Sequence, residues 1–139
     1  MTAPKHLLFS EGHVWIDVQG NRAMLGLSDY GQELAGSIVY IGLPETGETL
    51  HKGDLFVFIE AALPEESELE LSIPVSGVVT NVNRAVSEMP GSLNLNPYGS
   101  GWLVSLELSD PSELEGLLPA DEYERSYPVF PEDDEGDDG

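Results

Sequence analysis

Residues 55–77, LFVFIEAALPEESELELSIPVSG, predict a β-hairpin around which the rest of the chain is organised. Residues 55–60 are rich in the β-branched and aromatic side chains that favour strands. In residues 67–73, leucine and isoleucine alternate with glutamate and serine, which is the period-two pattern of a half-buried strand. Residues 61–66 must therefore reverse the chain, and Pro64 suits a turn because it has no N–H to donate to a strand ladder.

The predicted hairpin is acidic and lacks lysine, since Lys52 is the last lysine of the sequence. Paired carboxylates can share a proton and shift their pKa values, as in catalytic dyads. On an exposed hairpin tip we instead expect them to be solvated and available to a protein partner. The candidate contact residues are Glu60, Glu65, Glu66, Glu68 and Glu70.

The composition is that of one strongly acidic globular domain. The 139 residues include 26 acidic and 5 basic side chains, for a net charge of −21. Such a surface repels nucleic-acid phosphates and anionic membranes and favours basic protein partners, or it serves only solubility. No apolar run approaches the roughly 20 residues of a membrane span. We therefore expect a cytoplasmic monomer that binds protein partners, with no nucleic acid and no membrane among its ligands.

No cluster of residues suggests catalysis or metal binding. The chain has no cysteine, which excludes disulfides, thiolate metal ligands and a cysteine nucleophile. The three histidines, His6, His13 and His51, lack metal-ligand spacing. We therefore expect a protein that is not an enzyme and that holds no metal.

Two further stretches point to a known family. Residues 26–47, GLSDYGQELAGSIVYIGLPETG, predict a short helix capped by Ser28 and ended by Gly36, followed by a strand. This stretch resembles the H protein of the glycine cleavage system nearly position for position. Residues 94–103, NLNPYGSGWL, and the PVSG sequence at residues 74–77 also resemble that family, and the motifs follow in the family's order.

The resemblance covers roughly residues 5–125 and implies both a fold and a role. The implied fold is all-β with small helices: a flattened β-barrel of the lipoyl/biotinyl-carrier type, also called a barrel-sandwich hybrid, plus a C-terminal helix. The implied role is that of an aminomethyl carrier. A lipoyl arm on a hairpin lysine moves between the glycine decarboxylase, the aminomethyltransferase and the dihydrolipoamide dehydrogenase.

The chain departs from the family at the lysine that carries the arm. Its hairpin turn is about three residues longer than the family's, so the family position falls at Leu63 when counted forward from Glu60. Counted back from Pro74, it falls at Glu66. Neither side chain has the amine that a lipoyl amide requires, so no cofactor is expected. Lys52 is the nearest alternative attachment site, in the turn before the hairpin.

The N-terminal motif also departs from the family pattern, because Val14 follows His13 where the family has glutamate. We interpret His13 and Trp15 as packing residues. The other strands are expected at residues 7–9, 12–18, 22–27, 37–42, 78–83 and 102–108. Asn83 is expected to cap a helical segment over residues 84–88.

The C-terminal part predicts helices and a tail. Asp110 and Glu113 form a capping-box pattern at a helix start. The leucines expected on one face of that helix are Leu114, Leu117 and Leu118. We expect the domain to span residues 1–125, with a last helical turn at residues 120–125. Residues 126–139 contain six acidic residues and two prolines, and we predict a disordered tail there.

Four functional hypotheses follow from these observations. The first is a non-lipoylated H-protein-like domain that works through protein contacts, as a regulator or scaffold around glycine-cleavage or lipoate-dependent enzymes. The second is an acidic module for an unrelated basic partner. The third is a lipoylated aminomethyl carrier that uses Lys52, and the fourth is a decayed relative with no activity beyond folding.

Overall fold

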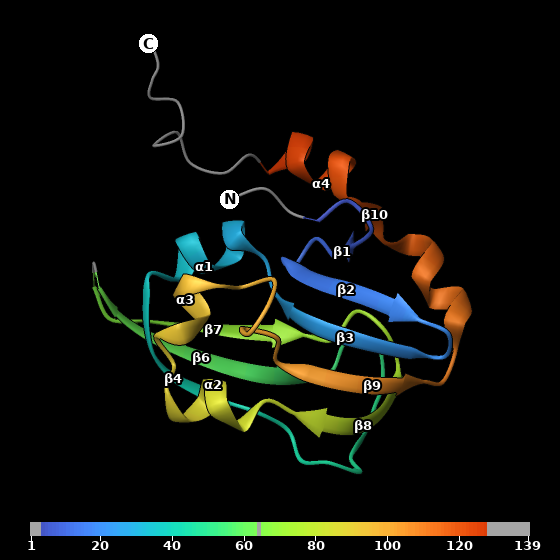
Figure 1. Cartoon of the computed structure of the whole chain (residues 1–139), viewed down its shortest axis with the longest axis horizontal. Helices are drawn as coiled ribbons and strands as arrows, with labels where there is room; N and C mark the ends of the chain where they lie inside the picture. The colour runs from blue at the N-terminus through green and yellow to red at the C-terminus, as the bar shows by residue number, and fades with distance from the viewer. Residues whose placement is uncertain (1–3, 64, 128–139) are drawn as a thin grey trace.

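The computed structural model describes residues 4–63 and 65–127, and it arranges their strands in two antiparallel sheets (Figure 1). Within these residues, a seven-stranded sheet has the order β10-β1-β2-β3-β9-β8-β5, and a three-stranded sheet has the order β4-β6-β7. The strands are β1 (Leu8–Phe9), β2 (Val14–Gln19), β3 (Arg22–Leu27), β4 (Ser37–Gly42), β5 (Thr49–Leu50), β6 (Leu55–Leu63), β7 (Ser67–Ser72), β8 (Gly77–Val82), β9 (Val104–Leu108) and β10 (Leu118–Pro119). The two sheets form a flattened, unclosed barrel-sandwich, which confirms the predicted fold class.

The larger sheet is built on the predicted N-terminal hairpin. Strands β2 and β3 pair in continuous register, from Val14 opposite Leu27 to Gln19 opposite Arg22. Gly20 in the turn has a φ of 63°, a left-handed conformation that glycine adopts without a Cβ clash. Strand β9 then pairs with both β3 and β8. The sheet therefore joins the first and last thirds of the chain.

The smaller sheet consists of the predicted central hairpin and its neighbour β4. Strand β6 reaches Leu63, three residues beyond the predicted end of the strand at Glu60, because β4 and β7 pair with it on both sides. The side chains of β7 alternate as predicted, with Leu71 buried and Glu68 and Glu70 exposed. The sheet therefore presents an acidic outer face.

Short helices close the ends of the strands: α1 (Asp29–Ala35), α2 (Arg84–Glu88), α3 (Ser92–Leu95), the 3-10 helix η1 (Pro111–Gly116) and α4 (Ala120–Ser126). The predicted caps of α1 are confirmed, since the Ser28 Oγ accepts a hydrogen bond from the Gly31 N–H and Gly36 has a φ of 93°. Asn83 caps α2 as predicted. Helix α3 was not among the predicted helices, and the strand that follows it begins at Val104 instead of the predicted residue 102.

The C-terminal segment differs from the prediction in two ways. The helix that begins after Asp110 is a single 3-10 segment that ends at Gly116, so Leu114 and Leu118 share no helical face, and Leu118 lies in β10. Glu113 accepts hydrogen bonds from Ser76 and therefore does not complete a capping box. Helix α4 extends to Ser126, one residue past the expected domain boundary. The predicted tail beyond residue 127 lies outside the described residues.

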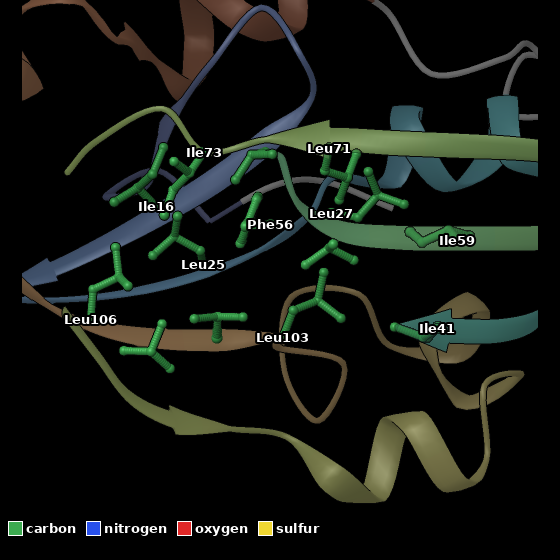
Figure 2. Close-up of a cluster of buried hydrophobic side chains, with 14 of the residues drawn as sticks. Ile16, Leu25, Leu27, Ile41, Phe56, Ile59, Leu71, Ile73, Leu103 and Leu106 are labelled. Atoms are coloured by element: carbon green, nitrogen blue, oxygen red, sulfur yellow. The ribbon is translucent and has the colours of Figure 1, made fainter. Parts of the chain in front are cut away.

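The main core lies between the two sheets (Figure 2). Isoleucine, leucine and phenylalanine side chains from both sheets fill it: those labelled in Figure 2 are Ile16, Leu25, Leu27, Ile41, Phe56, Ile59, Leu71, Ile73, Leu103 and Leu106. Burial of this apolar surface is the main force that holds the small sheet against the large one. The hairpin is therefore anchored along its inner face and leaves its outer face to solvent.

A second cluster attaches the C-terminal helix to the large sheet. Phe9 stacks on Tyr123 of α4 with ring centroids 4.2 Å apart. Trp15 of β2 lies opposite Phe9 and is also buried, and its indole N–H donates to the Pro97 carbonyl over 3.0 Å. The described residues contain no helix that is long and apolar enough to cross a membrane.

Candidate functional site

The β6–β7 hairpin corresponds to the hairpin predicted for residues 55–77. Its strands pair from Leu55 opposite Ser72 to Ala61 opposite Ser67, so the tip lies beyond this last pair. Figure 1 shows this tip at the left edge of the molecule, far from η1 and β9. Strand β4 supports the hairpin up to the tip, where Ser37 pairs with Leu63.

The tip carries acidic side chains and no amine. Glu65 and Glu66 are exposed, and Leu63 is the last residue of β6. Both positions counted for the family lysine, Leu63 and Glu66, therefore fall in or beside the tip. Pro64, which was predicted to make the turn, lies outside the described residues. A carrier arm attached by an amide bond has no attachment point in this hairpin.

Three carboxylates of the hairpin, Glu60, Glu68 and Glu70, form what we call the acidic face. Glu60 lies directly opposite Glu68, and Glu70 is the next outward-facing residue on β7. In the described part of the chain, none of the three forms an ion pair with a lysine, arginine or histidine. Like charges directly opposite each other on a sheet destabilise it. The fold therefore tolerates a local repulsion that a cationic partner would relieve.

Aromatic residues accompany the acidic face. Tyr40 of β4 lies opposite Glu60, and Phe58 of β6 lies opposite Glu70. The two rings are 6.3 Å apart, and Tyr40 is 49% exposed. Sequence reasoning missed both residues. The period-two alternation of residues 55–60 could have placed Phe58 beside Glu60, but it gave no orientation for Tyr40 on a different strand.

A surface hollow of about 450 Å³ lies beside the tip. Three glutamates and small or apolar side chains line it, all from the hairpin except Val39 of β4; the lining residues are Val39, Glu60, Ala61, Ala62, Glu66, Ser67 and Glu68. The hollow brings Glu66 of the tip together with Glu60 and Glu68 of the acidic face. Among the predicted contact residues, Glu70 lies further along β7 and lines a different groove.

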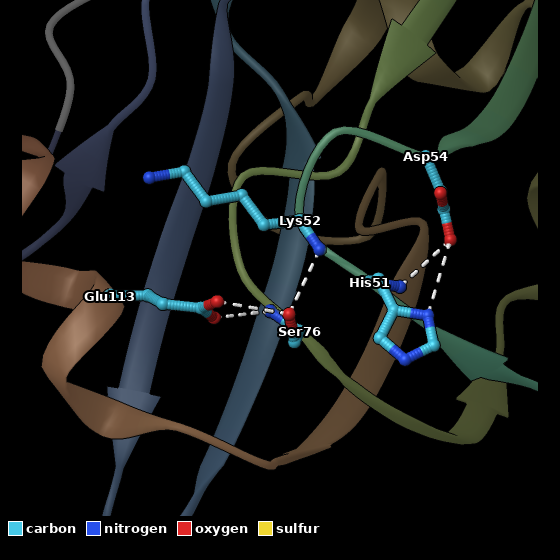
Figure 3. A network of polar contacts seen from close by, with 5 residues as sticks. All are labelled: His51, Lys52, Asp54, Ser76 and Glu113. Carbon is cyan, nitrogen blue, oxygen red and sulfur yellow. Dashed lines mark hydrogen bonds and ion pairs between the residues drawn. The ribbon is translucent and has the colours of Figure 1, made fainter.

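Lys52 lies at the opposite end of β6 from the tip. Strand β6 is nine residues long, so at about 3.3 Å per residue its two ends lie roughly 30 Å apart. Lys52 precedes this strand in a tight turn that includes Gly53, with a φ of 96°. Its side chain extends away from His51 and Asp54 in Figure 3. Lys52 and the hairpin tip therefore belong to different ends of the small sheet.

A hydrogen-bond network explains the serine of the PVSG sequence. The Ser76 hydroxyl accepts from the Lys52 N–H over 2.9 Å and donates to the Glu113 carboxylate over 3.0 Å (Figure 3). The Ser76 N–H also donates to Glu113 over 2.6 Å. In the same turn, the His51 N–H donates to Asp54 over 2.8 Å. These hydrogen bonds connect the Lys52 turn, the PVSG segment and η1, and they stabilise this end of the sheet.

His13 also has a structural role, in agreement with its interpretation as a packing residue. It has a φ of 72°, and its Nδ1 lies 2.8 Å from the Tyr123 hydroxyl, which in turn lies 2.7 Å from the Ser28 Oγ. Burial lowers the pKa of His13 and raises the pKa of Tyr123 well above its usual value. Both side chains are therefore neutral near pH 7, and they tie α4 to the start of α1.

Comparison with known proteins identifies the family. The model of the family described as "Glycine cleavage H-protein" matches residues 7–128. The chain belongs to the glycine cleavage H-protein family. A "Glycine cleavage system H protein" of Bacillus cytotoxicus is 41% identical over 123 residues, which cover 88% of this chain and 94% of that protein. One from Carboxydothermus hydrogenoformans is 40% identical over 122 residues, which cover 88% and 92%.

A solved structure supports the same assignment. The crystal structure of a glycine cleavage system H protein from Mycobacterium marinum matches with a TM-score of 0.80 and 29% identity, over 89% of this chain and 98% of that one. H proteins are lipoyl carriers of a multienzyme system and are not themselves catalysts. The family recognised from residues 26–47, 74–77 and 94–103 is thereby confirmed.

The family cofactor does not fit the hairpin of this chain. A lipoyl group is attached through an amide bond to a side-chain amine, and residues 53–139 contain no lysine. Lys52 has an amine, but it lies at the far end of β6 from the tip and outside the acidic hollow.

Proposed function

We propose that this member of the H-protein family works without a lipoyl arm, through protein contacts. In this proposal it acts in the cytoplasm as a regulator or scaffold around glycine-cleavage or lipoate-handling enzymes. The observation that supports it most is the hairpin, which has two paired strands and an acidic tip but no lysine to carry an arm. A surface that docks on glycine-cleavage or lipoate-handling enzymes can then serve for binding without transfer of an aminomethyl group.

The charge of the hairpin supports a binding role. Glu60 and Glu68 oppose each other across β6 and β7, and Glu66 lines the same hollow. Their repulsion costs stability in the isolated domain, and lysine or arginine side chains of a partner would remove that cost. Glu65 adds a further exposed charge at the tip. A partner with a basic groove matches this surface in charge.

A carrier role through Lys52 is less consistent with the geometry. A swinging arm delivers its reactive group to enzymes that dock around the attachment point. An arm on Lys52 would start roughly 30 Å from the hairpin tip, at the end of the sheet where Ser76 and Glu113 hold the turn. Enzymes that dock at the acidic hairpin would then meet no arm.

Binding to purified enzymes tests the proposal. Glycine decarboxylase, aminomethyltransferase, dihydrolipoamide dehydrogenase and lipoate ligase from the same organism are each titrated against the immobilised protein at moderate salt. We expect saturable binding of at least one. We also expect roughly tenfold weaker binding by the Glu60→Gln/Glu68→Gln variant, because charge complementarity is lost.

The matched control is the Glu11→Gln/Glu115→Gln variant, which removes two exposed carboxylates outside the hairpin. It should bind as tightly as the unaltered protein. If none of the four enzymes binds, the proposal is wrong, and a basic partner unrelated to glycine cleavage becomes the better hypothesis.

A further inference from the structure

A second surface depression lies on the same sheet, at the end opposite the hairpin tip. It has a volume of about 320 Å³ and runs between the loop after β4 and the first residues of β6. Its lining includes Leu43, Pro44, Leu55, Phe58, Glu48 and Glu70. None of these residues lines the acidic hollow beside the tip. The groove therefore shares Glu70 with the acidic face but shares no lining residue with the hollow beside the tip.

The walls of this groove are apolar and partly exposed. Leu55 is 58% exposed, and Phe58 is half-buried. A register shift between Leu55 and Val57 explains this arrangement. The irregularity buries two consecutive residues, Phe56 and Val57, so that Leu55 and Phe58 both remain on the outer face. Exposed apolar surface in a concave site is typical of a place where another molecule packs.

The rim of the groove is acidic. Glu48 lies at one side, and Glu70 lies opposite Phe58 on β7. Within the described ranges, neither carboxylate forms an ion pair, and the groove is lined by no lysine, arginine or histidine. A ligand that places an apolar group against Leu55 and Phe58 would therefore place its neighbouring groups beside two unneutralised carboxylates.

The negative charge at the rim of the groove excludes acidic molecules as its ligand. A second copy of this chain has a net charge of −21 and would bring the same carboxylates against each other. The C-terminal residues 132–138 are themselves acidic, and anionic lipid headgroups would be repelled in the same way. A segment of a partner protein that presents lysine or arginine beside an apolar side chain satisfies both the walls and the rim.

We propose that this groove, between Leu43 and Phe58, binds an apolar side chain of a partner protein whose adjacent residue is lysine or arginine. The apolar side chain packs on Leu55 and Phe58, and the cation lies between Glu48 and Glu70. This inference deepens the proposed function and rests on it, since it supplies a second contact for the same partner. It also names the partner's chemistry, which the hairpin carboxylates alone do not.

Titration with a short peptide tests the groove without knowledge of the partner. The probe is the blocked peptide acetyl-Leu-Lys-Leu-Lys-amide, added to the isotopically labelled full chain while backbone amide signals are followed by NMR. We expect saturable shifts at Leu43 and along residues 55–58. Replacing either both leucines of the peptide by serine or both lysines by glutamate should abolish them.

Variants of the protein distinguish peptide binding in the groove from non-specific electrostatic attraction to the acidic surface. Leu55→Ser and Glu70→Gln should each weaken peptide binding roughly five- to tenfold. The control Leu95→Ser alters a leucine that is 80% exposed on α3, outside the groove, and should leave the affinity unchanged. Shifts that spread over all acidic residues, or equal affinity of Leu55→Ser and the unaltered protein, would overturn the inference.

The enzyme titrations distinguish this inference from the proposed function. If Leu55→Ser binds the glycine-cleavage or lipoate enzymes as tightly as the unaltered protein while Glu60→Gln/Glu68→Gln does not, the groove inference fails alone. If no enzyme binds the unaltered protein, the proposed function fails, and saturable peptide binding at residues 55–58 would still support the groove.

Discussion

Ser76 shows how much of this fold depends on one small side chain. Its hydroxyl and its N–H connect the Lys52 turn to Glu113 of η1, and the residue is only 9% exposed. Replacing it by alanine leaves the Lys52 N–H and one Glu113 oxygen without partners. Both groups are only partly buried, so each lost hydrogen bond costs about 0.5–1.5 kcal/mol.

We therefore predict that Ser76→Ala lowers the free energy of unfolding by about 1–3 kcal/mol, measured by urea denaturation. Ser72→Ala is the matched control, because Ser72 is exposed at the end of β7 and should change the stability by less than about 0.5 kcal/mol. Equal stability of the two variants would show that the network in Figure 3 contributes nothing.

His13 should make stability depend on pH. Burial lowers its pKa in the folded state below the ordinary value of 6.5. As the pH falls below 6.5, the unfolded chain binds a proton on His13 that the folded chain does not yet bind. The unfolded state is therefore favoured progressively, and the stability associated with neutral His13 is present above pH 6.5 and lost below it.

His13→Asn tests this sign, because asparagine tolerates the left-handed backbone at this position and does not titrate. We predict that the free energy of unfolding of the unaltered protein falls relative to that of His13→Asn between pH 8 and pH 5. A difference between the two proteins that stays constant over this range would contradict the prediction.

At the level of single residues, the sequence could predict capping by a polar side chain when its hydrogen-bond partner is close in the chain, but not when the partner is distant. The caps Ser28 and Asn83 were predicted correctly because a cap bonds to residues only a few positions away. Glu113 was assigned to a local capping box, but its carboxylate bonds to Ser76, which is 37 positions away. Contacts between distant segments are set by the packing of the sheets, which a local pattern does not contain.

At the scale of the element, the hairpin is destabilised by its own charges. Glu68→Lys would place a cation directly opposite Glu60 and turn a repulsive pair into an attractive one. We predict that it raises the free energy of unfolding by about 0.2–1 kcal/mol at low salt, and that it weakens partner binding at the same time. Urea denaturation and the enzyme titrations measure the two effects.

Glu11→Lys is the control for net charge, because it makes the same change of charge at an exposed turn outside the hairpin. A gain in stability from Glu68→Lys that does not exceed the gain from Glu11→Lys would mean that overall charge, and not the pair with Glu60, is responsible.

Most strands and helices could be predicted from alternation and caps, but the two-residue strands β5 and β10 were missed, and the lengths of the longer strands could not be predicted. Strand β6 continues to Leu63 because β4 and β7 pair on both of its sides, although residues 61–66 read as a turn. The leucines at positions 114, 117 and 118 have helical spacing, but Leu118 pairs with Phe9 in β10. Pairing with distant strands thus overrides local propensity at both places.

At the scale of the whole molecule, the fold class could be predicted because several motifs occur in the order of one family. The acidic face could be predicted only in part. Alternation along β7 placed Glu68 and Glu70 outside, but the aromatic neighbours Tyr40 and Phe58 and the groove at Leu55 depend on how β4 and β6 pair. The position of Tyr40 and the groove arise from the assembled sheet, whereas Phe58 had a local signal in the alternation of β6.

The intact mass of the protein purified from its own cells tests most directly whether it works without a lipoyl arm. Peptide mapping of its lysines should accompany the measurement. We predict that neither lysine of this sequence, Lys5 or Lys52, carries an added lipoyl group. A mass higher by one lipoyl group, mapped to Lys52 or Lys5, would contradict the proposal and show that the protein is a carrier with an unusual attachment site.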